Sequence, residues 1–248
     1  MNHMNSLDGR TALVTNINHF VGLAAASALA ANGATVVCHD RDFTDADVRS
    51  AFEAAHVGYI ASPAQEPAEL IATTERDHGA INVLVSNDAF PAIRAPVESA
   101  DLADLRAGFE EMVVAPFALV GAAVPAMKAR KAGKIILVTS AAPLRGLPNY
   151  SMYAATRGAA NSLVISLARE LARDNIQVNA VAPNYVESPS YFPAELLEDE
   201  VARGKILKNI PLGRLGKPDE VGALIAFLAS PGGDFMTAQV IPVAGGWA

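Results

Sequence analysis

The stretch TALVTNINHFVGLAAASALAANGATVVCHD, residues 11–40, decides the fold. A β-branched run at its start is followed by a turn, an Ala/Leu-rich stretch of helical period and a second β-branched run. This order is typical of a parallel sheet, because parallel strands need a crossover connection, usually a helix. The stretch therefore predicts strands over Thr11–Thr15 and Thr35–His39, and a helix over Val21–Ala31.

The same alternation continues through the rest of the chain. Further strands are predicted over Gly58–Ala61, Asn82–Ser86, Lys134–Thr139, Ile176–Val181 and Val240–Val243, and helices over Glu66–His78, Leu102–Arg130, Tyr150–Arg173 and Pro218–Leu228. Right-handed crossovers then give an α/β fold, a single doubly wound Rossmann-like domain with a seven-stranded parallel sheet flanked by helices. The domain is expected to span residues 1–248, with residues 1–9 flexible. Its site should lie in the crevice at the carboxyl ends of the strands.

Composition and charge narrow the class of protein. The chain has 248 residues, of which 51% are hydrophobic and 18% charged, as suits one large domain with a well-filled core. A formal net charge of −7 leaves no basic surface to neutralise phosphates, so no nucleic-acid partner is expected. The lone cysteine, Cys38, and the absence of paired Cys and His spacings predict no disulfide, no metal site and a reducing, cytoplasmic compartment.

No membrane span is expected either. The longest apolar run, Val113–Met127, is interrupted by Pro116 and Pro125. The first residues lack the basic and apolar regions of an export signal. The sequence therefore predicts a soluble protein that is not exported.

The first turn, from Thr15 to Gly22, departs from a phosphate-binding loop. Such a loop needs glycine where the backbone touches a pyrophosphate, because a Cβ keeps the phosphate away from the helix amides. Only Gly22 is a glycine here, and Phe20 places a ring where a phosphate or nicotinamide would lie. The alternative is that Phe20 packs into the core beneath the loop. Both interpretations predict impaired nucleotide binding.

Asp40, after the second strand, has two interpretations. At this position of a dinucleotide-binding sheet an acid bonds a ribose 2′-hydroxyl. An acid between a strand and a helix is also a common cap or turn residue. The first interpretation favours a cofactor and the second does not.

Ser140, Tyr153 and Arg157 carry the predicted chemistry. Ser140 directly follows a strand, and the other two lie at i and i+4 of the next helix, so they share a face. A free tyrosine, with a pKa of about 10, is a poor base at neutral pH. A guanidinium about 4 Å from the phenolate stabilises it by roughly 4 kcal/mol at an effective dielectric near 20. Taken singly, the residues could be an exposed helix pair and a cap.

With their strand position, spacing and flanking sequence, these residues make the chain similar to the short-chain dehydrogenase/reductase superfamily from about Gly9 to its end. Within it the chain resembles the halohydrin dehalogenases, a branch without cofactor in which an Arg replaces the usual Lys. The resemblance implies that Ser140 anchors a substrate hydroxyl and that Tyr153 is the general base. It implies that Arg157 tunes the pKa of that tyrosine.

Three further departures from the dehydrogenase pattern agree with this resemblance. The usual Asn-Asn-Ala-Gly turn after the fourth strand is replaced at residues 86–90 by Ser-Asn-Asp-Ala-Phe. Met112 stands where the dehydrogenases carry a catalytic Asn, and Pro183–Tyr185 replaces a Pro-Gly. Each change removes part of a nicotinamide site.

In place of the nicotinamide, the resemblance implies a halide pocket. Its walls would be Phe20, Pro183, Asn184, Tyr185 and Phe192. Chloride and bromide are large and weakly hydrated, so N–H donors and aromatic edges can hold them without a counter-charge. Alternatively, Asn184 and Tyr185 merely shape a loop ahead of a flap.

The resemblance also implies a substrate pocket lined by Phe90, Pro143 and Leu144, each of which could equally be a core or turn residue. Asp88 is a candidate to orient Arg157, the alternative being an exposed loop acid. A homotetramer is implied as well.

The activity implied is that of a halohydrin dehalogenase, a carbon–halide lyase that needs no cofactor. It would form epoxides from vicinal haloalcohols and open epoxides with halide, azide, cyanide or nitrite. Two alternatives stay open: an NAD(P)-dependent short-chain alcohol dehydrogenase or ketoreductase, and a catalytically inactive sensor or scaffold on the same fold.

Overall fold

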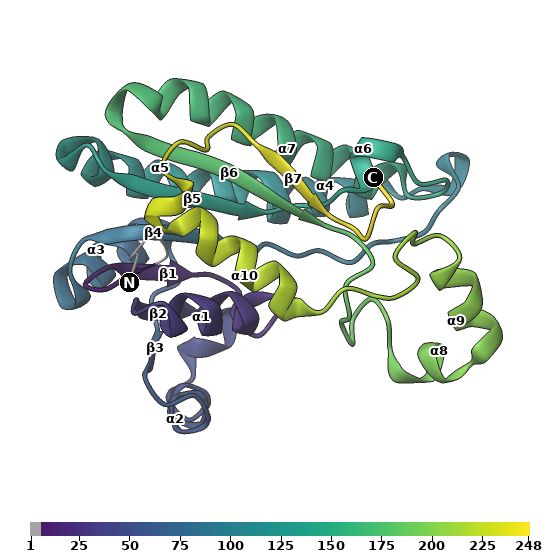
Figure 1. Cartoon of the computed structure of the whole chain (residues 1–248), viewed down its shortest axis with the longest axis horizontal. Coiled ribbons are helices and arrows are strands. Elements are labelled where there is room, and N and C mark those ends of the chain that lie inside the picture. Colours follow the sequence, from purple (N-terminus) through teal and green to yellow (C-terminus); the bar gives the residue numbers. More distant parts are fainter. Residues whose placement is uncertain (1–5) are drawn as a thin grey trace.

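Seven parallel strands form one sheet in the computed structural model, which describes residues 6–248 (Figure 1). The sheet order is β3-β2-β1-β4-β5-β6-β7, and every neighbouring pair is parallel. The strands are β1 Thr11–Val14, β2 Thr35–His39, β3 Tyr59–Ser62, β4 Ile81–Ser86, β5 Gly133–Val138, β6 Ile176–Pro183 and β7 Val240–Val243. The predicted fold class is confirmed, and each strand ends within two residues of its predicted bounds.

Helices cover both faces of the sheet. They are α1 Gly22–Ala31, α2 Ala46–Ala55, α3 Pro67–His78, α4 Leu102–Phe109, α5 Ala115–Arg130, α6 Ala142–Arg145, α7 Ser151–Leu171, α8 Ala194–Glu198, α9 Glu200–Leu207 and α10 Pro218–Ala229. One core lies beneath α1 and α10, where Leu29 and Ile225 are fully buried. The other lies beneath α3, α5 and α7, around Met127 and Val164.

The predicted helix Leu102–Arg130 is continuous but not uniform. Its middle, Glu110–Val114, is a π-helical turn between α4 and α5. By length and composition, the whole stretch Leu102–Arg130 is the one helix among residues 6–248 that could cross a membrane. The stretch packs against α3, α7 and the strands β4 and β5, and its buried apolar side chains belong to the second core.

The start of the chain corrects one prediction. Of the residues expected to be flexible, 1–5 lie outside the described part of the structure. Leu7, by contrast, is fully buried in the first core. Its N–H donates to the carbonyl of Asn32 at 2.7 Å, and its carbonyl accepts from Arg10 at 2.9 Å. Leu7 is therefore packed in the first core, whereas Asp8 and Gly9 after it are exposed.

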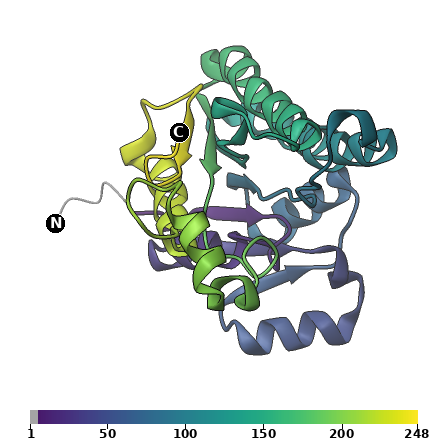
Figure 2. The same cartoon turned by 90° about the vertical axis from the view of Figure 1, so that its right-hand side faces the viewer.

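The strand order reverses between β1 and β4, which opens a crevice at the carboxyl ends of the strands. The segment carrying α8 and α9 lies at the same end of the molecule, and Figure 2 views the protein from that side. These two short helices were not among the elements named from the sequence, and neither were α2 and α6.

Candidate functional site

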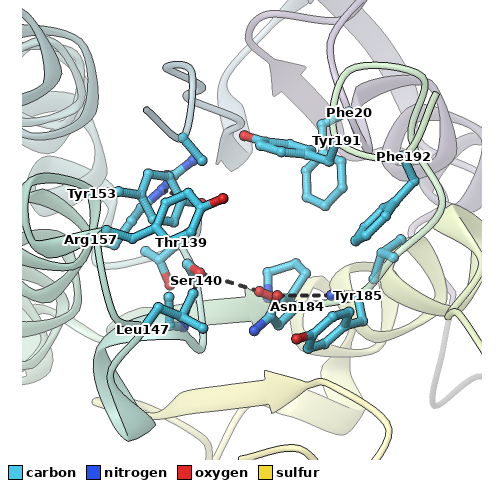
Figure 3. A pocket seen from close by; sticks show the side chains of 15 residues that line it. Phe20, Thr139, Ser140, Leu147, Tyr153, Arg157, Asn184, Tyr185, Tyr191 and Phe192 are labelled. Atoms are coloured by element: carbon cyan, nitrogen blue, oxygen red, sulfur yellow. Dashed lines mark hydrogen bonds between the residues drawn. The ribbon is translucent and has the colours of Figure 1, made fainter. Parts of the chain in front are cut away.

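A cavity of about 220 Å³ lies beyond the carboxyl ends of β5 and β6 (Figure 3). All the residues predicted for the catalytic and halide groups line it: Ser140, Tyr153, Arg157, Phe20, Pro183, Asn184, Tyr185 and Phe192. Tyr153 and Arg157 face Phe20, Tyr185 and Phe192 across the space. The predicted residues come from five separate parts of the chain. The fold therefore brings together both groups that the sequence placed in one site.

Ser140 follows β5 after one residue and is almost fully buried. Its hydroxyl accepts a hydrogen bond from the N–H of Ala142 at 3.1 Å and lies 3.5 Å from the carbonyl of Pro183, to which it donates. The carbonyl of Ser140 accepts from the amide of Asn161 at 3.2 Å. The hydroxyl is thus held between the end of β6 and the start of α6.

Arg157 lies one turn after Tyr153 on α7, and its guanidinium is held rigidly. One terminal nitrogen donates to the carbonyl of Val138 at 3.2 Å, and the other donates to the carbonyl of Asp88 at 3.0 Å. The remaining Nε–H donates to the Tyr153 hydroxyl at 3.3 Å. Two main-chain carbonyls therefore aim the charge at the phenol.

The pKa of Tyr153 lies below its ordinary value. Burial alone would raise it, but the charge and hydrogen bond of Arg157, together with the neighbouring hydroxyls of Ser140 and Tyr191, outweigh burial. The same contacts raise the pKa of Arg157 against the effect of its own burial, so the guanidinium stays charged. The pair can hold a buried phenolate ready to accept a proton.

Asp88 contacts Arg157 differently from the predicted way. The main-chain carbonyl of Asp88, not its carboxylate, accepts from the guanidinium. The carboxylate accepts from the Ser86 hydroxyl and from the amide of Asn16 at 3.4 Å. Burial raises the pKa of Asp88 to about 6, although the bond from Ser86 and the charge of Arg157 oppose this. Asp88 therefore orients Arg157 through its backbone.

The opposite side of the cavity offers an unused donor. The side-chain nitrogen of Asn184 is buried and has no hydrogen-bond partner among residues 6–248, while its oxygen accepts from the N–H of Tyr185 at 3.0 Å. Leaving such a donor unpaired costs about 1–3 kcal/mol, which a bound anion would recover. The centroid of the Tyr185 ring lies 6.1 Å from that of Phe192 and 5.8 Å from that of Trp247, so the three aromatic rings pack together.

Phe20 fulfils both interpretations of its position. Its ring lines the cavity and also packs against the first core. It meets the ring of Tyr191 edge-on at 5.5 Å. Its φ of 45° is uncommon for a bulky residue, so the turn holds the ring at this place against a conformational cost.

The residues around the first turn fit a dinucleotide poorly. Asp40 acts as a cap: its carboxylate accepts from the N–H groups of Asn18 at 3.0 Å and Asp42 at 3.3 Å. Gly22 is required by packing, because a Cβ there would lie 2.4 Å from the carbonyl oxygen of Ile17. With Phe20 inside the cavity, the site offers neither a free ribose acid nor a glycine-lined phosphate loop.

The three residues predicted for a substrate pocket do not line this cavity. Phe90 lines a neighbouring chamber of about 390 Å³ and meets Tyr153 only in a small space of about 10 Å³. Pro143 and Leu144 line neither: Pro143 packs over Gly158, and Leu144 is 51% exposed. The short helix α6 turns Ala142 toward the cavity and the next two side chains away from it. Leu147 and Tyr150 line the cavity instead.

Tyr191 is the main site residue that the sequence analysis missed. Its ring packs edge-on against Phe20, and its hydroxyl faces Tyr153, whose pKa it helps to lower. Burial and the neighbouring Tyr153 raise the pKa of Tyr191 to about 12, so this hydroxyl remains a donor. The sequence feature that could have indicated its role is the group of three aromatic residues within residues 185–192.

Replacing Tyr191 with phenylalanine is expected to raise the pKa of Tyr153, because one donor to the phenolate is lost. Ultraviolet absorbance of tyrosinate against pH measures this change. Tyr59→Phe, on β3 and away from the cavity, is the matched control and should leave the most acidic tyrosine titration in place. An unaltered titration in Tyr191→Phe would show that the contact does not stabilise the phenolate.

The described residues, 6–248, contain no group of His, Cys, Asp and Glu side chains arranged to hold a metal ion. The polar side chains that line the cavity include the phenols of Tyr153 and Tyr191, the Ser140 hydroxyl, the Arg157 guanidinium and the Asn184 amide.

Comparisons with known proteins give two kinds of relative. The chain matches a family model described as enoyl-(acyl carrier protein) reductase over residues 18–248. A solved structure described as a dehalogenation enzyme is 48% identical, with a TM-score of 0.95 over 98% of this chain and 99% of the other. A halohydrin dehalogenase bound to ethyl (2S)-oxiran-2-ylacetate is 40% identical, with a TM-score of 0.91 over 95% of this chain and 96% of the other. A curated tropinone reductase homologue of Arabidopsis thaliana is 35% identical over 98% of this chain and 91% of its own length.

Proposed function

Because the chain belongs to the short-chain dehydrogenase/reductase family and resembles halohydrin dehalogenases within it, we propose that it converts vicinal haloalcohols into epoxides. One observation carries the proposal. A tyrosine with a lowered pKa, 3.3 Å from a fixed guanidinium, faces a buried amide donor without a partner across one cavity. A base and an anion site so placed suit a reaction that removes a proton and releases halide.

The reaction needs only groups of this chain. Ser140 holds the substrate hydroxyl, and the Tyr153 phenolate takes its proton as the O–H bond breaks. The oxygen forms a bond to the neighbouring carbon from the rear, and the carbon–halogen bond breaks with its electron pair leaving on the halide. The halide enters the space between Phe20 and Asn184–Tyr185, and Tyr153 later gives the proton to water. Positioning of an intramolecular nucleophile accounts for much of the acceleration.

The reverse reaction follows from microscopic reversibility. An anion in the halide space attacks an epoxide carbon, while Tyr153 donates its proton to the opening oxygen. Halide, azide, cyanide and nitrite are the expected nucleophiles. Haloalcohols, epoxides and these anions are thus the proposed small-molecule partners of the protein.

We also propose that the chain works as a homotetramer in the cytoplasm. Exposed apolar side chains on α4, α5 and α7 support association, since Leu102, Phe117 and Ile165 would be covered by a partner. Such a partner would pack against the layer that also holds Tyr153.

The direct test mixes the purified protein with propylene bromohydrin. Bromide, measured with an ion-selective electrode, and propylene oxide, measured by gas chromatography, should appear in equal amounts. An absence of bromide with this and larger bromohydrins would contradict the proposal and favour a scaffold. A separate fluorescence titration with NADH tests the dehydrogenase alternative, for which tight binding would be the favourable result.

Asn184→Asp is expected to weaken halide binding by at least about tenfold, because a carboxylate would then face the anion at close range. Inhibition of epoxide formation by added bromide measures this. Asn209→Asp, at an exposed position two residues after α9, adds the same charge away from the cavity and serves as the control. Equal bromide inhibition in Asn184→Asp and the wild type would place the halide elsewhere.

A further inference from the structure

The single tryptophan of the chain, Trp247, supports the halide space from outside the cavity. It packs with Ala141 and Ala182 in a small apolar cluster, and only 5% of its surface is exposed. Its ring meets the ring of Tyr185 edge-on, with the centroids 5.8 Å apart. Trp247 is therefore in contact with a wall of the cavity although it does not line the cavity itself.

A tight turn after β7 brings Trp247 to this position. The N–H of Trp247 donates to the carbonyl of Ala244 at 3.0 Å, and φ is 59° at Gly245 and 86° at Gly246. A turn with positive φ at both central residues favours glycine at each, because a Cβ crowds the backbone there. The two glycines therefore allow the chain to turn back and place the indole against Tyr185.

Arg145, the last residue of α6, holds this tryptophan by two contacts. Its guanidinium donates to the main-chain carbonyl of Trp247 at 2.7 Å, and its Cζ lies over the indole, 5.2 Å from the ring centroid. The face of an indole attracts a cation, so the second contact is favourable as well. Arg145 has no part in the bond-breaking steps proposed above.

Tyr185 depends on contacts of this kind. Its φ of 55° is unfavourable for a bulky residue, and such a conformation persists only where the surroundings hold it. Its ring is held by Phe192 and Trp247. Arg145 also acts on the phenol by its charge, because burial raises the pKa of Tyr185 and the guanidinium opposes that rise.

The backbone of Tyr185 in turn orients the anion donor. Its N–H donates to the side-chain oxygen of Asn184 at 3.0 Å, and this bond fixes the direction of the buried, unpartnered amide nitrogen. A change in the backbone of Tyr185 would therefore turn the amide. Contacts thus run from Arg145 through Trp247 and Tyr185 to Asn184.

We propose that Arg145 is a positioning residue for the halide space: it fixes Trp247, which keeps Tyr185 and Asn184 in the geometry that binds the anion. The inference rests on the proposed function. It separates anion binding from proton removal, because the guanidinium of Arg157 is held instead by the carbonyls of Val138 and Asp88.

The test measures anion binding by Arg145→Ala. The inhibition constant of bromide in epoxide formation and the KM for azide in epoxide opening should both rise by at least about fivefold, because a hydrogen bond and a cation–π contact are lost. The KM for the epoxide and the acid limb of the pH–rate profile should not change. Arg145→Lys keeps a cation beside the indole and should recover part of the affinity.

The control is Arg173→Ala, which removes an exposed arginine that does not line the cavity. Fluorescence checks the contact itself, since all tryptophan emission comes from Trp247. The emission should move to longer wavelength in Arg145→Ala and stay in place in the control. Arg145→Gln, which loses the charge but keeps a donor for the Trp247 carbonyl, should weaken anion binding in the same direction and decides the matter if Arg145→Ala does not fold.

Two results would overturn the inference. One is wild-type anion binding in the folded Arg145 variants, even with a shifted emission. The other is a loss of anion affinity accompanied by an equal loss of epoxide affinity and a displaced acid limb, which would indicate a general loosening of the site. Both leave the proposed function standing if the wild type releases bromide from propylene bromohydrin, whereas an absence of that release contradicts the function itself.

Discussion

Tyr153→Phe is expected to lower kcat for bromohydrin conversion by about 10²- to 10⁴-fold, the usual contribution of a positioned acid or base. The ring keeps the shape of the cavity, but no oxygen remains to accept the proton of the substrate hydroxyl. Initial rates of bromide release measure the effect.

Halide binding is the internal control for this variant. Phe20, Asn184 and Tyr185 lie on the other side of the cavity, so bromide should still bind Tyr153→Phe with an unchanged dissociation constant. Isothermal titration calorimetry with bromide provides that constant. Wild-type turnover in Tyr153→Phe would show that another group removes the proton.

Substitution of Arg157 is expected to move the acid limb of the pH–rate profile to higher pH. Burial raises the pKa of Tyr153, and the guanidinium is the main group that opposes it. In Arg157→Gln the opposing charge is lost, the phenol is protonated at neutral pH, and kcat/KM there should fall by about 10- to 1,000-fold. Arg157→Lys keeps a charge but cannot reach both carbonyls, so its profile should lie between those of the wild type and Arg157→Gln.

Arg130 provides a control for the loss of a partly buried guanidinium. It bonds Glu75 at 3.0 Å and the main-chain carbonyl of Ile81, far from the cavity lining. Arg130→Gln should lower thermal stability and leave the acid limb in place. If Arg157→Gln had the wild-type profile after correction for folded fraction, the guanidinium would have no part in ionising Tyr153.

The strands were predictable because most are short runs rich in β-branched residues that end near turn residues. Val240–Val243 was predicted with its observed bounds, although it lies at the sheet edge. The helices α8 and α9 were not named, because residues 187–217 carry no sustained apolar period and none of the residues in these two helices is buried. Tertiary contacts, which a local pattern does not contain, place this segment.

For the site, too, a local sequence pattern predicted some contacts and could not predict others. The spacing of Tyr153 and Arg157 on one helix predicted their contact, since i and i+4 side chains share a face. The contact of Asp88 with Arg157 runs through a carbonyl, and sequence letters describe side chains only. Pro143 and Leu144 point away from the cavity because of the turn direction of α6, which depends on backbone angles.

Ser140 and the loop Pro183–Tyr185 follow neighbouring strands, and adjacent strands of a sheet lie about 4.8 Å apart. Hydrogen bonds continue past the strand ends, with Thr139 bonded to Val181 at 2.8 Å and Ala141 to Pro183 at 3.2 Å. The backbone therefore fixes the separation between the anchor of the reacting oxygen and the space for the departing anion. In the proposed reaction, the paired ends of β5 and β6 thus hold the anchor of the reacting oxygen beside the space for the departing anion, so the rigidity of the sheet itself aligns the two ends of the displacement.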